Sequence, residues 1–320
     1  MTGKHAASGS GRNHGYGRDM AYAGRQALQE YYGGGHFATV ATHAGRFGQF
    51  AEWAREQGVR DIARNDPQQL LMGYATHVGQ QADAKKLSAA YAQNLISSAQ
   101  VVLRAMTGDD SIRVSPSAYC GSRTNVRAEA PGSIDRSAVE HSTEAMRSAG
   151  LDRAASVVEL ARELGMRERE AALADLARLD REAREHGAVN IQEGAKGGRT
   201  ADRWVPVSAE GRVALDAALA ARPDGRRNLL EVGETFRGFV DSELRQGREL
   251  LKEAGIAGYH DCRAGYACDR YKQLTGYSAP VVAGFRQAPS HSDLEARGQI
   301  GAELGHGRDD VLVSYVGGRT

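Results

Sequence analysis

The chain of 320 residues has few aromatic residues, few cysteines and almost no net charge. Aromatic residues make up 6% of it, and Cys120, Cys262 and Cys268 are an odd number without the spacing of zinc ligands. Such cysteines fit free thiols in a reducing cytoplasm. A net charge of +1 gives no bulk signal of a polyanionic partner, so the local distribution of charge matters more than the sum.

Long apolar runs are also missing. No stretch approaches the roughly 18 residues of a membrane span, and the N-terminus lacks the apolar core of a secretory signal. We therefore expect no membrane partner and a cytoplasmic location. Alanine, arginine and glutamate are abundant instead, which favours helices. The length predicts two domains.

The C-terminal half carries a series of cations ahead of a lone tyrosine. A phenol is a poor nucleophile at neutral pH because its pKa is about 10. It becomes useful where neighbouring cations stabilise the charge on the group that it attacks. The series consists of Arg167 in Gly-Met-Arg-x-x-Glu, Lys196 in a Gly-rich turn, His260 and Arg263 in His-x-x-Arg, His306 in Leu-Gly-His, and Tyr315 nine residues later.

This series resembles the boxes of the tyrosine recombinase, or phage-type integrase, family, and in particular a subgroup of mobile-element integrases. The family has a Gly-Leu-Arg-x-x-Glu box, a Gly-Lys-Gly hairpin turn, a His-x-x-Arg box, and Leu-Gly-His followed nine residues later by tyrosine. Each box alone is a weak signal, and all of them in order are a strong one. The resemblance covers roughly residues 135–320, and more loosely the helical region before them.

The resemblance implies a site-specific DNA recombinase that cuts and rejoins DNA through a 3′-phosphotyrosine intermediate and integrates or excises a mobile element. Tyr315 would attack the phosphate, and Lys196 would protonate the leaving 5′ oxygen. Glu170 would orient Arg167 from one helical turn away. No metal or other cofactor is implied. The phosphate would be held by Arg167 and Arg263, with His260 and His306 as further donors or as handlers of the nucleophile's proton.

The implied partners are double-stranded DNA and further copies of the chain, as a tetramer on two DNA sites. Accessory proteins that bend DNA or set the direction of recombination are further implied partners. The implied location is the cytoplasm of a bacterium, in association with the nucleoid. Two alternatives stay open: DNA relaxation like that of a type IB topoisomerase, and an inactive DNA-binding protein of the same fold. A metal site at His260 and His306 is disfavoured, because Arg263 would repel a cation.

The expected fold is mainly α with a small β-sheet. Residues 1–24, poor in apolar side chains, predict a disordered arm, with a basic arm on DNA phosphates as the alternative. Apolar residues at three- and four-residue spacing predict a helical core-binding, DNA-binding domain over 25–107. A linker over 108–134 and an α+β catalytic domain over 135–320 follow. Candidate phosphate contacts in the first domain, each weighed against a solvated surface charge, are Arg46, Arg55, Lys85, Lys86 and Arg104.

In the second domain we expect strands over 188–192 and 203–207 around the turn with Lys196, and one long helix over 228–254. The sequence departs from the family pattern at Cys262 and Ala264, where leucine and histidine are usual. From Arg263 to His306 the spacing is 43 residues, about twice the usual distance. The excess predicts an inserted loop around residues 275–297, which either contacts DNA or a neighbouring subunit or is exposed decoration. Five residues follow Tyr315, too few for the tail exchange of many relatives.

Overall fold

The computed structural model describes residues 11–195 and 202–319. The chain divides into two compact units, Met1–Thr124 and Asn125–Thr320, each with its own hydrophobic core. The predicted site residue Lys196 lies outside the described residues. The described part is mainly helical with one two-stranded sheet, which confirms the predicted fold class.

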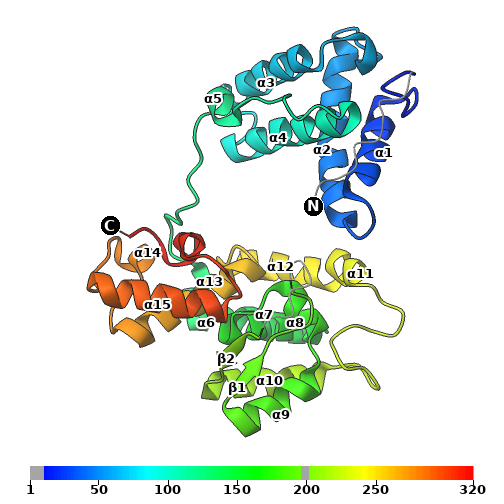
Figure 1. The fold of residues 1–320 in the computed structure, drawn as a ribbon. Coiled ribbons are helices and arrows are strands. Elements are labelled where there is room, and N and C mark those ends of the chain that lie inside the picture. Colours follow the sequence, from blue (N-terminus) through cyan, green and yellow to red (C-terminus); the bar gives the residue numbers. More distant parts are fainter. Residues whose placement is uncertain (1–10, 196–201, 320) are drawn as a thin grey trace. The chain divides into compact units, whose positions relative to one another are not determined.

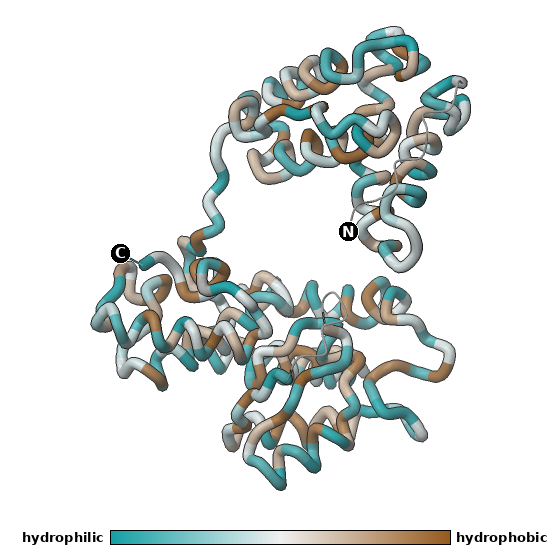
Figure 2. The backbone as a smooth tube through the Cα atoms, viewed as in Figure 1, coloured by the Kyte–Doolittle hydropathy of each residue, from teal (hydrophilic) through white to brown (hydrophobic). Residues whose placement is uncertain are grey.

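In the first unit, every regular element among residues 11–124 is a helix (Figure 1). Helix α4 packs against α1, α2 and α3, and its buried face includes Leu95, Ile96, Val102 and Leu103. Figure 2 shows hydrophobic and hydrophilic residues alternating along these helices, as one-sided burial requires. The elements are α1 (Met20–Tyr32), α2 (Phe37–Glu56), η1 (Ile62–Arg64), α3 (Pro67–Asp83), α4 (Ala89–Thr107) and α5 (Pro116–Cys120).

The ends of these helices follow local sequence signals. Asp66 caps α3 by accepting from the N–H groups of Gln68 and Gln69, and Pro67 occupies the first helical position. The hydroxyl of Ser88 caps α4. Gly108 ends α4 with φ of +72°, a conformation that costs glycine little. These starts and stops agree with the sequence.

The predicted disordered arm is wrong for residues 11–24. Helix α1 begins at Met20, and Asn13 is fully buried. The backbone N–H of Asn13 donates to Asp61 at 2.8 Å, and its side-chain oxygen accepts from the Ile62 N–H at 2.9 Å. A segment poor in apolar residues is thus fixed by hydrogen bonds at Asn13 as well as by the burial of Met20 and Ala23, and composition does not reveal such hydrogen bonds. Residues 1–10 of the predicted arm lie outside the described residues.

The second unit has α7 at its centre, in contact with α6, α8, α10, α12 and α13 (Figure 1). The helix is buried on most of its circumference, from Ala154 to Leu164, which suits a central position. The helices are α6 (Arg136–Ser148), α7 (Asp152–Leu164), α8 (Glu168–Leu173), α9 (Leu176–His186), α10 (Ala209–Ala221), α11 (Phe236–Asp241), α12 (Glu243–Glu253), α13 (Tyr259–Thr275), α14 (Pro280–Ala283), α15 (Ser290–Glu303) and α16 (Val313–Val316), with the 3₁₀ turns η2 (Gly132–Ile134) and η3 (Asp309–Leu312).

The sheet is the antiparallel hairpin of β1 (Ala188–Asn190) and β2 (Trp204–Pro206), with Val189 opposite Val205. Both of these valines are fully buried, so the hairpin is anchored in the core of the unit. The residues between the strands include Lys196. The strands predicted around this turn are therefore present, although each is shorter than predicted.

Two segments predicted as irregular are folded. Helix α5 lies inside the predicted linker, and Ser133 near the linker's end donates from its N–H and its hydroxyl to Asp261 on α13. In the predicted inserted loop, Asp293 and Arg297 on α15 are buried and paired at 2.9 Å. Arg297 also donates to the carbonyls of Gly317 and Gly318, so this segment holds the residues that follow Tyr315. The α15 end of the segment is therefore packed into the unit, whereas Tyr277, Val282 and Phe285 of the same segment are exposed.

The long helix expected over 228–254 is also wrong. Residues 228–235 are irregular, and Ser242 (φ −110°, ψ −99°) separates α11 from α12. The Ser242 hydroxyl donates to the carbonyl of Gly238 at 2.7 Å. A side chain that bonds to nearby backbone competes with a regular helix, and periodicity does not detect this.

Among residues 11–195 and 202–319, no helix combines the length and the apolar character that crossing a membrane requires.

Candidate active site

Arg167 stands at the start of α8, two residues after the glycine that ends α7. Gly165 has φ of +59°, and a Cβ atom there would come within 2.6 Å of the Tyr266 ring, so the turn requires glycine. The backbone N–H of Arg167 donates to Glu170 Oε2 at 2.7 Å, and Arg167 Nη1 lies 2.5 Å from Glu170 Oε1. Glu170 therefore orients Arg167, as the three-residue spacing predicts.

Arg263, on α13, is fully buried and joins three of the sequence boxes. It donates to the carbonyl of Gly165 in the first box and to the carbonyl of Leu304 in the Leu-Gly-His box. Its Nε lies 3.3 Å from the Tyr315 hydroxyl. Burial is the main reason that the pKa of Arg263 is lowered to about 10, which still leaves the guanidinium charged at neutral pH. A fixed cation therefore lies against the tyrosine.

The carboxylate of Glu170 is fully buried among three arginines. Besides Arg167, it contacts Arg203 Nη1 at 2.8 Å and Arg263 Nη1 at 3.6 Å. Burial raises the pKa of Glu170, but Arg203, Arg263 and Arg167 outweigh it, so the net shift is downward. Glu170 is therefore the common counter-ion of the site.

Sequence reasoning missed Arg203, which lies next to β2. Its Nε donates to the carbonyl of Glu303 at 2.7 Å, and its Nη2 donates to the carbonyl of Gly165 at 3.2 Å. Arg203 thus connects the hairpin to the first box and to the helix that precedes His306. The sequence signal for Arg203 was its position as a charged residue at the start of a half-buried strand. Many surface arginines share that position, so the signal does not identify a site residue.

Tyr315 lies on the short helix α16 with a side chain that is 3% exposed. Its hydroxyl lies 3.1 Å from His306 Nε2, and its ring centroid is 5.2 Å from that of His260. Two other buried tyrosines of the second unit are placed differently: Tyr266 donates to Glu303 and Tyr271 donates to Asp293. Their hydroxyls are bound to carboxylates, whereas that of Tyr315 contacts Arg263 and His306.

His306 is neutral in this arrangement. Burial, followed by the charge of Arg263, lowers the pKa of His306 to about 4. Burial and Arg263 also lower the pKa of His260. Because Arg263 Nη2, 3.4 Å from His306 Nε2, can only donate, Nε2 must carry the lone pair. The Tyr315 hydroxyl, which accepts from Arg263 Nε, is then free to donate its proton to His306.

The lowered pKa of His306 predicts a loss of stability in acid. Between pH 6.5 and about 4 the unfolded chain binds a proton at His306 that the folded chain does not, so the free energy of unfolding should fall as the pH falls through this window. Urea unfolding followed by Trp204 fluorescence, in a Trp53→Phe background, measures this for the second unit. His306→Gln should show a smaller fall; equal slopes in the two proteins would contradict the lowered pKa.

A cavity of about 1010 Å³ opens beside these residues. Arg167, His260, His306 and Tyr315 line it, together with Arg203. Ala195, the residue before Lys196, also lines it, whereas Lys196 lies outside the described residues. Across the part of the chain that the structure describes, no group of three or more His, Cys, Asp or Glu residues is placed to hold a metal ion.

The candidate phosphate contacts of the first unit differ in availability. Arg55, Lys85 and Lys86 are exposed, and Arg46 is half-buried. Arg104 donates from Nε to the carbonyl of Ile112 at 2.6 Å, so its side chain holds the end of α4 against the segment that follows.

Two arginines, Arg167 and Arg203, the two histidines and the Tyr315 hydroxyl line one cavity, and these are groups that can donate hydrogen bonds to an anion. Residues 121–269 match the family model described as integrase. This match confirms the resemblance to the tyrosine recombinase family that the motifs indicate. The matched range contains Arg167, His260 and Arg263, and it ends before His306 and Tyr315.

The crystal structure of XerA recombinase is similar at 17% identity, over 92% of this chain and 93% of that chain, with a TM-score of 0.37. A TM-score this low establishes no common fold. No curated protein matches the chain.

Proposed function

We propose that this protein is a site-specific DNA recombinase that cuts and rejoins DNA strands through a covalent 3′-phosphotyrosine at Tyr315. The observation that carries the proposal is the contact of one tyrosine hydroxyl with a buried arginine and a neutral histidine, 3.3 Å from Arg263 Nε and 3.1 Å from His306 Nε2. The family match supports the broader statement that the chain acts in DNA recombination.

In the proposed reaction the Tyr315 oxygen attacks a backbone phosphorus, and the bond between phosphorus and the 5′ oxygen breaks. His306 Nε2 accepts the phenol proton. Arg167 and Arg263 donate to the non-bridging oxygens, where negative charge builds up in the transition state. Lys196 supplies a proton to the leaving 5′ oxygen; the position of Ala195 in the wall of the cavity supports this role.

Rejoining reverses these steps. A 5′ hydroxyl attacks the phosphotyrosine, the phosphorus–tyrosine bond breaks, and the phenol regains its proton. The ester conserves the energy of the original bond, so no nucleotide cofactor is needed. For strand exchange we propose a tetramer on two duplexes, assisted by DNA-bending or directionality proteins. It would integrate or excise a mobile element on the bacterial nucleoid in the cytoplasm.

The test is to capture the covalent intermediate. The DNA site is first defined by the duplexes that the protein selects from a random-sequence library. The selected duplex is then nicked near the crossover, so that cleavage releases a short fragment that carries the free 5′ hydroxyl. Because this fragment diffuses away, cleavage cannot reverse. We expect a denaturant-resistant adduct whose modified peptide contains Tyr315. Specific binding without any adduct would favour the inactive DNA-binding alternative. An adduct at another tyrosine would refute the proposed nucleophile.

A further inference from the structure

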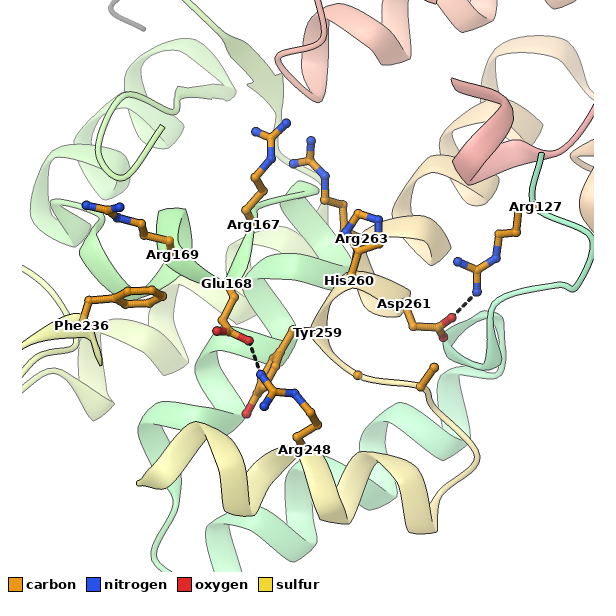
Figure 3. A pocket seen from close by; sticks show the side chains of 12 residues that line it. Arg127, Arg167, Glu168, Arg169, Phe236, Arg248, Tyr259, His260, Asp261 and Arg263 are labelled. Carbon is orange, nitrogen blue, oxygen red and sulfur yellow. Dashed lines mark hydrogen bonds and ion pairs between the residues drawn. The ribbon is translucent and has the colours of Figure 1, made fainter. Parts of the chain in front are cut away.

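A second cavity, of about 550 Å³, adjoins the candidate active site. Arg167 and His260 line both cavities, so these two side chains form a shared wall. Figure 3 shows three further arginines around the second cavity, Arg127, Arg169 and Arg248, which the proposed reaction does not use.

The lining of this cavity is strongly cationic. It contains five arginines and two carboxylates, and each carboxylate is already paired. Glu168 lies 2.7 Å from Arg248, and Asp261 is paired with Arg127 (Figure 3). Arg167 and Arg263 of the lining share the buried carboxylate of Glu170. Arg169 is therefore the lining arginine that none of these three carboxylates neutralises. An uncompensated cationic hollow attracts an anion.

Arg169 is the arginine best placed to bind that anion. Its guanidinium lies 5.7 Å from the centroid of the Phe236 ring. Figure 3 shows these two side chains beside each other. Its side chain is exposed, and it has no carboxylate partner within the described ranges 11–195 and 202–319. A ring face orients a guanidinium while leaving its N–H groups free to donate.

The start of α13 adds to the positive potential. This helix of 17 residues begins at Tyr259, and Ala257, Gly258 and Tyr259 line the cavity. Gly258 (φ +141°) precedes it without a side-chain cap, so no hydroxyl or carboxylate cap covers the first N–H groups. The N-terminal end of a helix favours a negative charge.

We propose that this cavity binds a backbone phosphate of the cleaved strand, next to the reacting phosphate, with Arg169 as its contact. The inference rests on the proposed function, because a DNA strand carries closely spaced phosphates, one per roughly 3.4 Å of helix axis. The shared wall of Arg167 and His260 places neighbouring phosphates in the two cavities. The subsite would fix the register of the strand at Tyr315.

The test combines single neutral phosphates with single arginine variants. A methylphosphonate is placed in turn at each position flanking the crossover of the selected duplex, and the dissociation constant is measured for the wild type and for Arg169→Ala. A hydrogen bond to a charged group contributes about 1.5–3 kcal/mol, so each change alone should weaken binding about tenfold or more. At one flanking position, Arg169→Ala and the methylphosphonate together should weaken DNA binding no further than either change does alone.

Arg245→Ala is the matched control. Arg245 is exposed on α12, the helix that carries Arg248, and it is not part of the cavity. This variant should show no coupling to any position. Arg169→Ala should also reduce the slope of log affinity against log salt by about 0.9, because one phosphate contact is lost. Arg169→Lys, which keeps the charge, should retain most of that slope.

If the loss of affinity caused by Arg169→Ala and the loss caused by the methylphosphonate multiply at every flanking position, the proposed subsite is wrong. Its failure and that of the proposed function can be told apart, because adduct formation by the wild type is measured separately. Coupling without any adduct would keep the phosphate subsite and reject the recombinase chemistry. An adduct at Tyr315 without coupling would support the recombinase chemistry and reject the phosphate subsite.

Discussion

Tyr315→Phe is expected to form no covalent adduct with the nicked duplex while binding it with near wild-type affinity. The substitution removes the one oxygen that lies between Arg263 Nε and His306 Nε2. It keeps the ring that packs between His260 and His306, at centroid distances of 5.2 and 5.3 Å. Because phenylalanine has no atom that could attack phosphorus, the loss should be complete rather than partial. Denaturing electrophoresis of the protein with end-labelled DNA measures it.

Tyr266→Phe provides the control for that loss. Tyr266 is also buried in the second unit and also donates a hydrogen bond from its hydroxyl, to Glu303 at 2.8 Å. Its removal leaves one buried acceptor short of a donor, which costs about 1–3 kcal/mol of stability. It should leave adduct formation intact at a temperature where the variant is folded. An adduct formed by Tyr315→Phe, or its absence in Tyr266→Phe under those conditions, would contradict the assignment.

The order of the motifs was enough to predict which residues gather at the site. Arg167 precedes α8, whereas His260 lies on α13, and both line one cavity together with His306 and Tyr315. Arg263, also on α13, is buried behind them and lies 3.3 Å from the Tyr315 hydroxyl. Motif spacing carries this information because each box sits at a fixed place on a helix or a turn, such as Arg167 directly after the turn that Gly165 makes possible. The described residues do not include Lys196, so its place in the site stays a prediction.

The features that were not predicted depend on polar contacts between residues far apart in the sequence. Asn13 is buried through Asp61, and Arg297 is buried through the carbonyls of the C-terminal glycines. Arg203 reaches Glu170 from a neighbouring strand. Hydrophobic periodicity identifies faces that become buried, but it carries no signal for a buried charge whose partner comes from another element. The segment with Asn13 was therefore predicted as a disordered arm, the segment with Arg297 as an inserted loop, and Arg203 as part of a strand without a role in the site.

Glu170→Gln is expected to destabilise the second unit by about 3–5 kcal/mol, because it leaves a buried cluster of arginines without its counter-ion. Glutamine keeps the shape and an oxygen that accepts from the backbone N–H of Arg167, so the loss isolates the charge. Urea unfolding followed by Trp204 fluorescence in the Trp53→Phe background measures it. Glu168→Gln, which breaks the part-exposed pair with Arg248, should cost at most about 1 kcal/mol.

The cluster also predicts how this loss depends on pH and on a second substitution. The folded-state pKa of Glu170 lies below 4.5, so its contribution is present above pH 4.5 and is lost as the pH falls through the folded pKa. The difference in the free energy of unfolding between wild type and Glu170→Gln should therefore narrow as the pH falls below 4.5. Adding Arg203→Met to Glu170→Gln should recover part of the loss, because one uncompensated buried charge is removed. A double variant less stable than Glu170→Gln would show that Arg203 is held by its carbonyl contacts and not by the carboxylate.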